Sequence, residues 1–251
     1  MSATPALSVS GLTVAFGGIV AVNNVTLDLP VGARSALIGP NGAGKTTFVN
    51  LLTGTLKPTA GTIRIGDKDV TRLDTRARTK LGLTRTFQIN TLFPHLTPLE
   101  SVSLAIAERE DKGGIWWRRL GGFGAIRDEA EALLTQLRLI EHARTPTNEL
   151  AYGKQRLLEI ALALAAKPRI LLLDEPAAGI PAGESREVFE VVDALPDDIS
   201  VLFIEHDMQL VFRFARRIVV LTSGAILTEG TPDEIRANEE VRAAYLGGAH
   251  V

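Results

Sequence analysis

A glycine-rich loop joins two apolar stretches of the chain, residues 36–38 before it and residues 48–52 after it. The loop reads GPNGAGKTT and fits the pattern G-x-x-x-x-G-K-[ST] at all four fixed positions. Glycines let successive backbone N–H groups turn inward around phosphate oxygens, and a helix that begins at the lysine adds the positive end of its dipole. The pattern therefore predicts a strand, a phosphate-binding loop and a helix, and disfavours a glycine-rich turn that binds nothing.

The polar residues of this loop have distinct expected roles toward a nucleoside triphosphate. Lys45 would reach the β and γ phosphates, Thr46 would ligate Mg²⁺, and the Thr47 hydroxyl would meet the α phosphate. The residues of the loop that we predict to bind the nucleotide are Gly39, Pro40, Asn41, Gly42, Ala43, Gly44, Lys45, Thr46 and Thr47.

Length and composition exclude several classes of protein. The 251 residues suffice for one large domain or two interlocked ones. A net charge of −2 argues against a dedicated nucleic-acid surface, and the absence of cysteine excludes a disulfide framework and any cysteine-ligated metal. No stretch approaches the roughly 20 apolar residues that span a bilayer, so we expect a protein that is soluble or held at a membrane by a partner.

Strand patterns fill the first seventy residues. Apolar and polar residues alternate from residue 7 to residue 29, which predicts antiparallel strands, and residues 61–70 predict a hairpin that turns near Gly66. Phe16 is a lone aromatic residue in this section. Two interpretations of it stay open: core packing, or stacking of its ring on a purine.

Helical patterns follow. Thr97 and Glu100 form a capping box with a proline at the first helical position, and an apolar stripe runs along residues 126–140. Residues 157–166 are apolar nearly all round, which predicts a buried helix. The segment 108–124 between the first two patterns is expected to be a loop.

Trp116 and Trp117 stand in that loop beside two arginines and among five glycines. We favour an irregular surface segment whose tryptophans cover a local core. The alternative is a contact with a membrane-embedded partner or lipid headgroups, because tryptophan and arginine suit such interfaces.

After Pro168 the pattern alternates between strand and helix. Aliphatic runs at residues 170–173, 201–204 and 218–221 predict strands buried on both faces, and residues 188–195 carry a helical face between the first two. This order implies parallel pairing and an α/β core. A second capping box at Thr231 predicts a terminal helix.

Polar residues at the ends of these strands are candidates for chemistry on the phosphates. Asp174 and Glu175 end the first aliphatic run, at the edge where open α/β sheets bind ligands. Asp174 would hold Mg²⁺ through water and Glu175 would polarise the attacking water, whereas without a phosphate loop both would be solvated carboxylates. His206 would contact the γ phosphate or be an ordinary polar residue. Gln88 would bridge the metal and move with the helical section.

The chain resembles the nucleotide-binding subunits of ABC transporters over essentially its whole length. The segments that carry the resemblance are GPNGAGKTT, Gln88, LAYGKQ at residues 150–155, RILLLDE at residues 169–175 and His206. The resemblance implies an α/β fold: a P-loop NTPase (RecA-like) core with an N-terminal antiparallel β subdomain and an inserted α-helical subdomain. Residues 1–88 and 166–251 would form the ATP-binding core, and residues 89–165 the helical subdomain.

The resemblance also implies ATP and Mg²⁺ as ligands and a pair of subunits that sandwich two ATP molecules. Each ATP would then meet the signature segment of the partner, represented here by Ala151, Tyr152 and Gly153. The expected partners are a second, identical or paralogous ATPase subunit, transmembrane permease subunits and, indirectly, a substrate-binding protein. The expected location is the cytoplasmic face of the cell membrane, with no nucleic acid bound.

A closer resemblance is to the ATPases of branched-chain amino-acid importers. It rests on TRTFQ at residues 84–88, LFP at residues 92–94, DEPAAG at residues 174–179, IEHDM at residues 204–208 and AYLG at residues 244–247. Two features depart from the commonest family pattern. Ala151, Tyr152 and Lys154 replace three positions of the signature LSGGQ and leave Gly153 as a backbone donor, and Pro181 stands where many relatives have an acidic residue.

Three other classes of function share some of these motifs. A transporter of another cargo or an exporter would share the same motifs. A soluble ABC ATPase acting on DNA or ribosomes would usually have two cassettes in one chain or a long inserted coiled coil. A GTPase or small-molecule kinase would leave the signature segment and His206 unexplained, and the chain has no Asn-Lys-x-Asp guanine motif.

Overall fold

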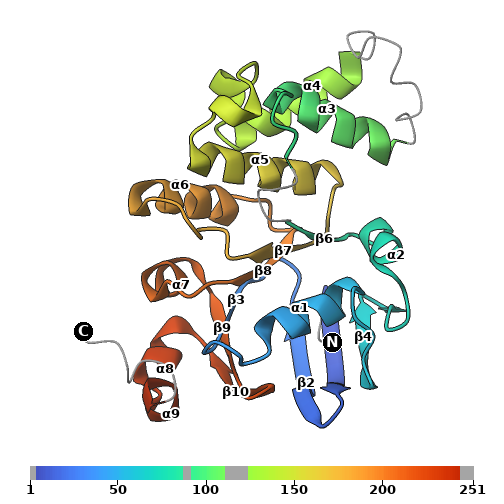
Figure 1. The fold of residues 1–251 in the computed structure, drawn as a ribbon, viewed down its shortest axis with the longest axis vertical. Coiled ribbons are helices and arrows are strands. Elements are labelled where there is room, and N and C mark those ends of the chain that lie inside the picture. Colours follow the sequence, from blue (N-terminus) through green and yellow to red (C-terminus); the bar gives the residue numbers. More distant parts are fainter. Residues whose placement is uncertain (1–3, 87–91, 111–123, 244–251) are drawn as a thin grey trace. The chain divides into compact units, whose positions relative to one another are not determined.

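The computed structural model describes residues 4–86, 92–110 and 124–243 of the chain. They divide into two compact units, whose elements are labelled in Figure 1. Unit 1 takes its residues from the ranges 1–83, 169–175 and 196–251, and unit 2 from the ranges 84–168 and 176–195. Gln88, Trp116 and Trp117 lie outside the described residues, as do residues 111–123 of the expected loop and the AYLG segment at residues 244–247.

Unit 1 contains an antiparallel sheet of four strands in the order β2-β1-β4-β5. β1 pairs with β2 along its whole length, and β5 returns to β4 across a turn at residues 66 and 67. The predicted antiparallel strands and the predicted hairpin are therefore confirmed. The strands are β1 (Leu7–Phe16), β2 (Ile19–Leu29), β4 (Ala60–Ile65) and β5 (Lys68–Asp69).

A second sheet has the order β10-β9-β3-β8-β7-β6. Strand β3 lies parallel between β8 and β9, and β8 is also parallel to β7. Every residue of β3 and β8 is buried, as strands covered on both faces require. The predicted parallel α/β core is confirmed. The strands are β3 (Arg34–Ile38), β6 (Leu83–Arg85), β7 (Ile170–Asp174), β8 (Ser200–Ile204), β9 (Arg217–Thr222) and β10 (Ala225–Gly230).

One hydrophobic core joins both sheets of unit 1. Helix α1 contributes Phe48, Leu51 and Leu52 to it, next to residues of β1, β2, β4, β7, β8 and β9. The capping box at Thr231 is present and begins α8 as predicted. The helices of this unit are α1 (Lys45–Thr53), α2 (Thr75–Lys80), α7 (Met208–Phe214), α8 (Pro232–Ala237) and α9 (Glu239–Val241).

Unit 2 is built from helices. α3, α4 and α5 pack against one another, and α6 packs against α5. The capping box at Thr97 is present, and α5 is buried along most of its length, so both predictions are confirmed. The helices are α3 (Pro98–Arg109), α4 (Gly124–Gln136), α5 (Tyr152–Ala165) and α6 (Ala182–Asp193), with short 3₁₀ turns at Ile140–His142 and Thr147–Glu149.

The apolar stripe along residues 126–140 predicts one helix, but the structure ends that helix earlier. α4 stops at Gln136, and Arg138 has a left-handed φ of 56°, which no helix interior accepts. Among the described residues, the helices are all too short or too polar to cross a membrane.

Candidate nucleotide-binding site

The glycine-rich loop stands between the end of β3 and the start of α1, as its sequence pattern predicts. Gly44 is the N-cap of α1, with a left-handed φ of 98°, and no side chain caps that end of the helix. The first N–H groups of an α-helix have no partners inside the helix and carry its positive dipole end. The start of α1 is therefore suited to an anion.

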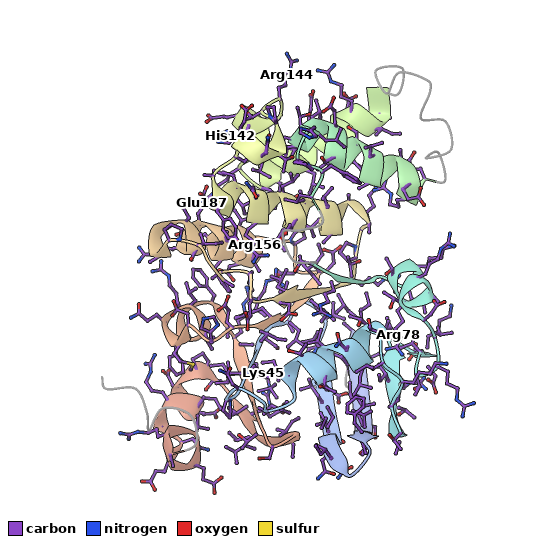
Figure 2. All side chains as sticks on the ribbon, viewed as in Figure 1. Lys45, Arg78, His142, Arg144, Arg156 and Glu187 are labelled. Carbon is purple, nitrogen blue, oxygen red and sulfur yellow. The ribbon has the colours of Figure 1, made fainter. Side chains whose placement is uncertain are left out.

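Lys45 lies at the start of α1, where it is labelled in Figure 2. Its ammonium Nζ donates to the carbonyl oxygens of Gly39, at 2.6 Å, and Pro40, at 3.0 Å. Burial lowers the pKa of the Lys45 ammonium, while the carboxylates of Glu175 and Asp174 act in the opposite direction. A half-buried cation with two neutral carbonyls as acceptors is able to exchange them for phosphate oxygens, which are stronger acceptors.

Two glycines of the loop leave no room for a side chain. A Cβ atom at Gly39 would lie 2.1 Å from the carbonyl oxygen of Leu221, and one at Gly44 would lie 2.4 Å from the carbonyl oxygen of Ala21. Gly42 also has a left-handed φ, of 80°, but a Cβ atom there would meet nothing within 4 Å. Backbone from β9 and β2 therefore encloses the loop at Gly39 and Gly44, whereas Gly42 faces open space.

This difference predicts unequal effects of alanine. We expect Gly42→Ala to lower the free energy of unfolding by about 1–2 kcal/mol, the cost of a left-handed backbone in an L-residue. Gly44→Ala adds the overlap with backbone, which costs about 1–3 kcal/mol more, and it should also weaken nucleotide binding. Urea unfolding of the two variants measures the difference; equal losses would show that the enclosure does not matter.

A cavity of about 430 Å³ opens over the loop. This volume falls within the range of small-molecule sites, about 300–1,000 Å³. Its lining combines the loop with apolar residues of β2, one carboxylate and a turn. The lining residues are Ile19, Val20, Ala21, Asn41, Gly42, Ala43, Gly44, Lys45, Thr46, Thr47, Glu175, Ile204, Ser223 and Gly224. Gly39 and Pro40 contact Lys45 but do not line the cavity.

The turn between β9 and β10 is hydrogen-bonded to the glycine-rich loop. This contact was not predicted from the sequence. Gly224 donates its N–H to the carbonyl oxygen of Ala43, at 2.9 Å, and its own carbonyl accepts from the N–H of Asn23, at 2.8 Å. Ser223 and Gly224 both have positive φ. The dipeptide Ser223-Gly224 between two apolar runs is a turn signal, but nothing local indicates that the turn contacts the loop.

Asp174 ends β7, and Glu175 follows it with a left-handed φ of 48°. The N–H of Glu175 donates to the carbonyl oxygen of Ile204, at 3.0 Å, which fixes the backbone at the end of the neighbouring strand β8. Left-handed backbone is unfavourable for glutamate, and residues held in such conformations cluster at functional sites. Glu175 also lines the cavity, so a strained residue places a carboxylate beside the phosphate loop.

His206 follows β8 and lies largely in solvent, with 67% of its side chain exposed. Its backbone N–H donates to Oε2 of the buried Glu205 at 3.2 Å, and its Nδ1 lies 3.9 Å from the same oxygen. It does not line the 430 Å³ cavity. Its contact with a γ phosphate stays a prediction.

Phe16 is half exposed at the end of β1, so the core-packing interpretation is wrong. The ring does not line the cavity, whereas the neighbouring Ile19 and Val20 do, and both have exposed side chains. Stacking of Phe16 on a purine stays a prediction. Gln88 belongs to the part of the chain that is not described, and β6 ends before it, at Arg85.

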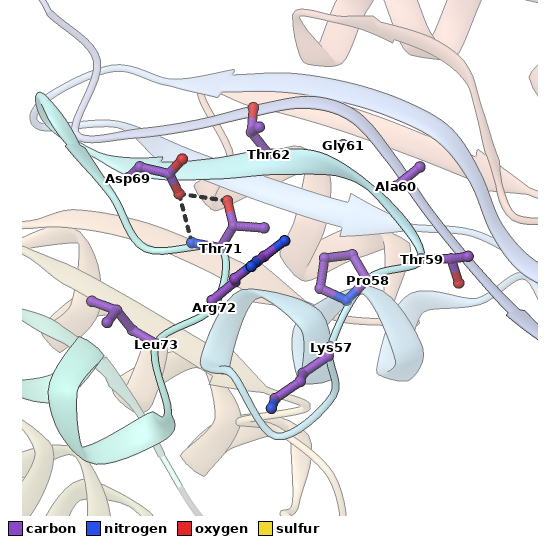
Figure 3. A pocket seen from close by; sticks show the side chains of 10 residues that line it. All are labelled: Lys57, Pro58, Thr59, Ala60, Gly61, Thr62, Asp69, Thr71, Arg72 and Leu73. Carbon is purple, nitrogen blue, oxygen red and sulfur yellow. Dashed lines mark hydrogen bonds between the residues drawn. The ribbon is translucent and has the colours of Figure 1, made fainter.

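A second hollow in unit 1, of about 720 Å³, contains none of the predicted site residues (Figure 3). Its one carboxylate, Asp69, accepts from the N–H and the hydroxyl of Thr71, at 2.8 and 2.6 Å. These bonds lower the pKa of Asp69. The carboxylate of Asp69 is thus hydrogen-bonded to Thr71, and we assign no chemistry to this larger hollow.

The signature segment lies in unit 2. Ala151 is the N-cap of α5, and Tyr152 and Gly153 are its first residues. The N–H of Gly153 donates to Oε2 of Glu184 at 2.8 Å, and Tyr152 lies against Gly179. Pro181 is the N-cap of α6. No described group of three or more His, Cys, Asp or Glu side chains could hold a metal ion by itself.

Comparison with known proteins adds to this geometry. Residues 22–178 match the family model for ABC transporters, and residues 225–251 match the model for branched-chain amino acid ATP-binding cassette transporters. The chain is 44% identical to the high-affinity branched-chain amino acid transport ATP-binding protein LivG of Escherichia coli, covering 98% of this chain and 99% of LivG. It is 42% identical, with the same coverage, to the corresponding protein BraF of Pseudomonas aeruginosa.

A solved structure has the same fold. The ADP conformation of MJ1267, an ATP-binding cassette of an ABC transporter, superposes with a TM-score of 0.84 at 27% identity, covering 96% of this chain and 98% of MJ1267. The predicted fold class is therefore confirmed, and so is the predicted family. With its phosphate loop, its parallel sheet and these matches, the chain belongs to the ATP-binding proteins of ABC transporters, in the group of the branched-chain amino acid cassettes.

Proposed function

We propose that this ABC ATPase powers the import of branched-chain or related amino acids. The observation that carries the ATPase activity is the strained Glu175, which lines one cavity together with Lys45 and the uncapped start of α1. The cargo rests on the 44% identity to LivG over nearly the whole chain. A transporter with another cargo, an exporter and a soluble ABC ATPase are the alternatives; recovery of a substrate-binding protein with this chain would favour import and lead to the cargo, and recovery of no membrane protein would favour the soluble ATPase.

The residues of unit 1 fit a nucleoside triphosphate. The N–H groups at the start of α1 would bind phosphate oxygens, and Lys45 would exchange its two carbonyl acceptors for the β and γ phosphates. The Thr47 hydroxyl would meet the α phosphate. Phe16 would stack on the adenine from the end of β1, next to the apolar wall formed by Ile19 and Val20.

The same residues fit Mg²⁺, which takes one or two protein oxygens and completes its shell with waters and phosphates. Thr46 would supply a hydroxyl and Asp174 a carboxylate acting through water; Gln88 would join them from outside the described residues. When bound, Mg²⁺ neutralises charge on the β and γ phosphates. Glu175 would accept a hydrogen bond from the attacking water and orient it in line, and His206 would contact the γ phosphate.

The second half of each site would come from another subunit. Ala151, Tyr152 and Gly153 would face the γ phosphate bound by the partner subunit, with the Gly153 N–H as the donor. A related cassette of 28% identity and TM-score 0.72, MJ0796, is known as a dimer in a post-hydrolysis state with ADP and phosphate, covering 90% of this chain and 98% of that one. We infer that residues 1–88 and 166–251 act as the ATP-binding core and residues 89–165 as the helical subdomain.

The subunit would be held at the cytoplasmic face of the membrane by permease subunits, and a substrate-binding protein would deliver the cargo. A gentle pull-down of this chain from native membranes, followed by mass spectrometry, tests this arrangement. We expect two multispanning proteins and a second ATPase. A chain that instead sediments alone or with ribosomes would exclude transport and leave the ATP chemistry intact.

The nucleotide preference is tested separately. We expect titration of the purified chain to show tight binding of ATP and weak binding of GTP. A Lys45→Ala variant, which removes the cation that meets the phosphates, should lose binding of both nucleotides. Tighter binding of GTP than of ATP would exclude an ATPase and favour a GTPase.

A further inference from the structure

Two helices of unit 2 begin beside one carboxylate. α5 begins at Tyr152 and α6 at Ala182, and neither has a side chain that caps its own first turn. Glu184, in the first turn of α6, places Oε2 at 2.8 Å from the N–H of Gly153, in the first turn of α5. This carboxylate therefore acts as the anion at the positive end of α5.

The contact is close enough to require a glycine. A Cβ atom at Gly153 would lie 2.5 Å from Oε2 and 2.9 Å from Cβ of Glu184. Gly153 is not in a left-handed conformation, since its φ lies outside that range. The absence of a side chain at this position is therefore used for the approach of Glu184 and not for a special backbone angle.

α6 has other polar contacts with its neighbours besides that of Glu184. Two further acids lie at three-residue intervals along the same face of α6 and pair with cations. Glu187, labelled in Figure 2, binds Nζ of Lys154 at 2.8 Å, and Glu190 binds Nη1 of Arg138 at 3.3 Å. These two ion pairs join α6 to α5 and to Arg138, which follows the end of α4. Glu184 alone in this row uses its carboxylate on a backbone N–H.

We propose that Glu184 is a built-in competitor of the nucleotide at the signature segment. The inference rests on the proposed function, in which the Gly153 N–H donates to the γ phosphate of ATP held by the partner subunit. One N–H group cannot make a full hydrogen bond to both anions, and two anions at one helix start repel each other. The carboxylate must move away before two subunits close on ATP, so Glu184 raises the ATP concentration that closure needs.

The size of the effect follows from populations. The apparent dissociation constant equals the intrinsic one divided by the fraction of molecules whose binding group is available, so a small available fraction weakens binding. If Glu184 occupies the Gly153 N–H in roughly 70–90% of molecules, its removal should lower the ATP concentration for half-maximal pairing about three- to tenfold. ATP binding by the single subunit should stay unchanged, because the phosphate loop and the cavity over it belong to unit 1.

The test compares Glu184→Gln with its neighbour Glu187→Gln, both in a Glu175→Gln background that retains ATP. Glutamine keeps the length of the side chain and an acceptor oxygen, so a purely structural role of Glu184 would survive the change. ATP-dependent pairing is followed by sedimentation velocity, and ATP binding by titration at a protein concentration where the subunits do not pair. Glu184→Ala is made in parallel and read in the same way.

We expect the lowest ATP midpoint for pairing with Glu184→Ala, a smaller decrease with Glu184→Gln, which loses the charge but keeps an acceptor oxygen, and no decrease with Glu187→Gln. An unchanged or higher midpoint with the two Glu184 variants would overturn the competitor role and leave the ATPase assignment standing. Should no variant bind ATP or pair at any ATP concentration, including the one with Glu184 and Glu187 intact, the proposed function itself would fall.

Discussion

Replacing Glu175 with glutamine is expected to leave ATP binding intact and to slow ATP hydrolysis by about a hundredfold or more. A positioned general base contributes about 10²–10⁴-fold to a rate, and an amide cannot accept the proton that the attacking water loses. Glutamine keeps the length of the glutamate side chain, and Lys45, Thr46 and Thr47, which would bind the phosphates, are unchanged in the variant. The loss should therefore appear in turnover and not in the affinity for ATP.

The local geometry of Glu175 explains why the effect should depend on this one side chain. The residue is held in a left-handed conformation by its N–H bond to Ile204, and it lines the same cavity as Lys45 and Thr46. Asp174, one residue earlier, ends β7 itself and belongs to the ladder of the sheet, opposite Ile204. Consecutive carboxylates therefore have different backbone surroundings, which fits different tasks.

Two measurements check this prediction. Release of phosphate under saturating ATP reports turnover, and titration with ATP reports binding. Asp197→Asn is the matched control, because Asp197 is an exposed acid of the same unit and its ion pair with Arg216 spans 3.9 Å. We expect that control to change turnover less than twofold. Near-normal hydrolysis by Glu175→Gln would remove Glu175 from the mechanism.

The parts of the fold that follow from short-range patterns were predictable. A loop with glycine at fixed positions needs the strand before it and the helix after it, and the structure has β3 and α1 there. Buried parallel strands require uninterrupted aliphatic runs, and such runs predicted β7, β8 and β9 from the sequence. The starts of α3 and α8 were predictable from their capping boxes, because the hydrogen bonds of a capping box join residues only three positions apart.

Contacts between distant residues could not be predicted in this way. Gly224 braces Ala43 from 181 positions away, and Glu184 meets Gly153 from 31 positions away. Neither pair has a local pattern that announces it. Phe16 shows a related limit. The alternation of apolar and polar residues predicted that it lies in a strand, but only the folded structure shows that its side chain, at the end of β1, is half exposed.

Arg78 is another such contact, and its loss should have the largest effect on stability. Its side chain on α2 is buried, with 1% of the residue exposed, and is labelled in Figure 2. Nη1 donates to the carbonyl oxygens of Leu51, at 2.6 Å, and Leu52, at 2.7 Å, in the last turn of α1. Nε donates to the carbonyl of Leu73 at 3.1 Å, and Nη2 to that of Thr71 at 3.0 Å.

These four bonds solve a specific problem of the phosphate-loop helix. The last carbonyls of an α-helix have no partner inside the helix. The last turn of α1 contains Leu51 and Leu52, which lie in the hydrophobic core. A cation at that end also meets the negative end of the helix dipole. Burial lowers the pKa of the Arg78 guanidinium because removing its charge from water costs free energy. The hydrogen bonds to the four carbonyls must offset that cost.

We therefore expect Arg78→Leu to lower the free energy of unfolding by about 3–5 kcal/mol, because four carbonyl groups lose a charged donor at about 1–3 kcal/mol each and leucine recovers part of this by apolar packing. Arg78→Lys should recover only part of this loss, because an ammonium is compact and cannot span four carbonyls as the planar guanidinium does. Arg76→Ala is the control: this exposed arginine lies on the same helix, and its loss should stay within about 0.5 kcal/mol.

Urea unfolding followed by circular dichroism measures all three variants, and titration with ATP at low urea shows whether the loop still binds when the far end of α1 has lost its cap. The two ends of α1 serve different purposes: its first turn is left open for phosphate, and its last turn is closed by Arg78. If Arg78→Leu were as stable as the unmodified chain, leucine would be compensating for the lost bonds by apolar packing. The carbonyl of Leu51 would keep the N–H of Gly54, at 3.2 Å, as its donor, the carbonyl of Leu52 would have to find another, and the guanidinium would not be what closes this helix.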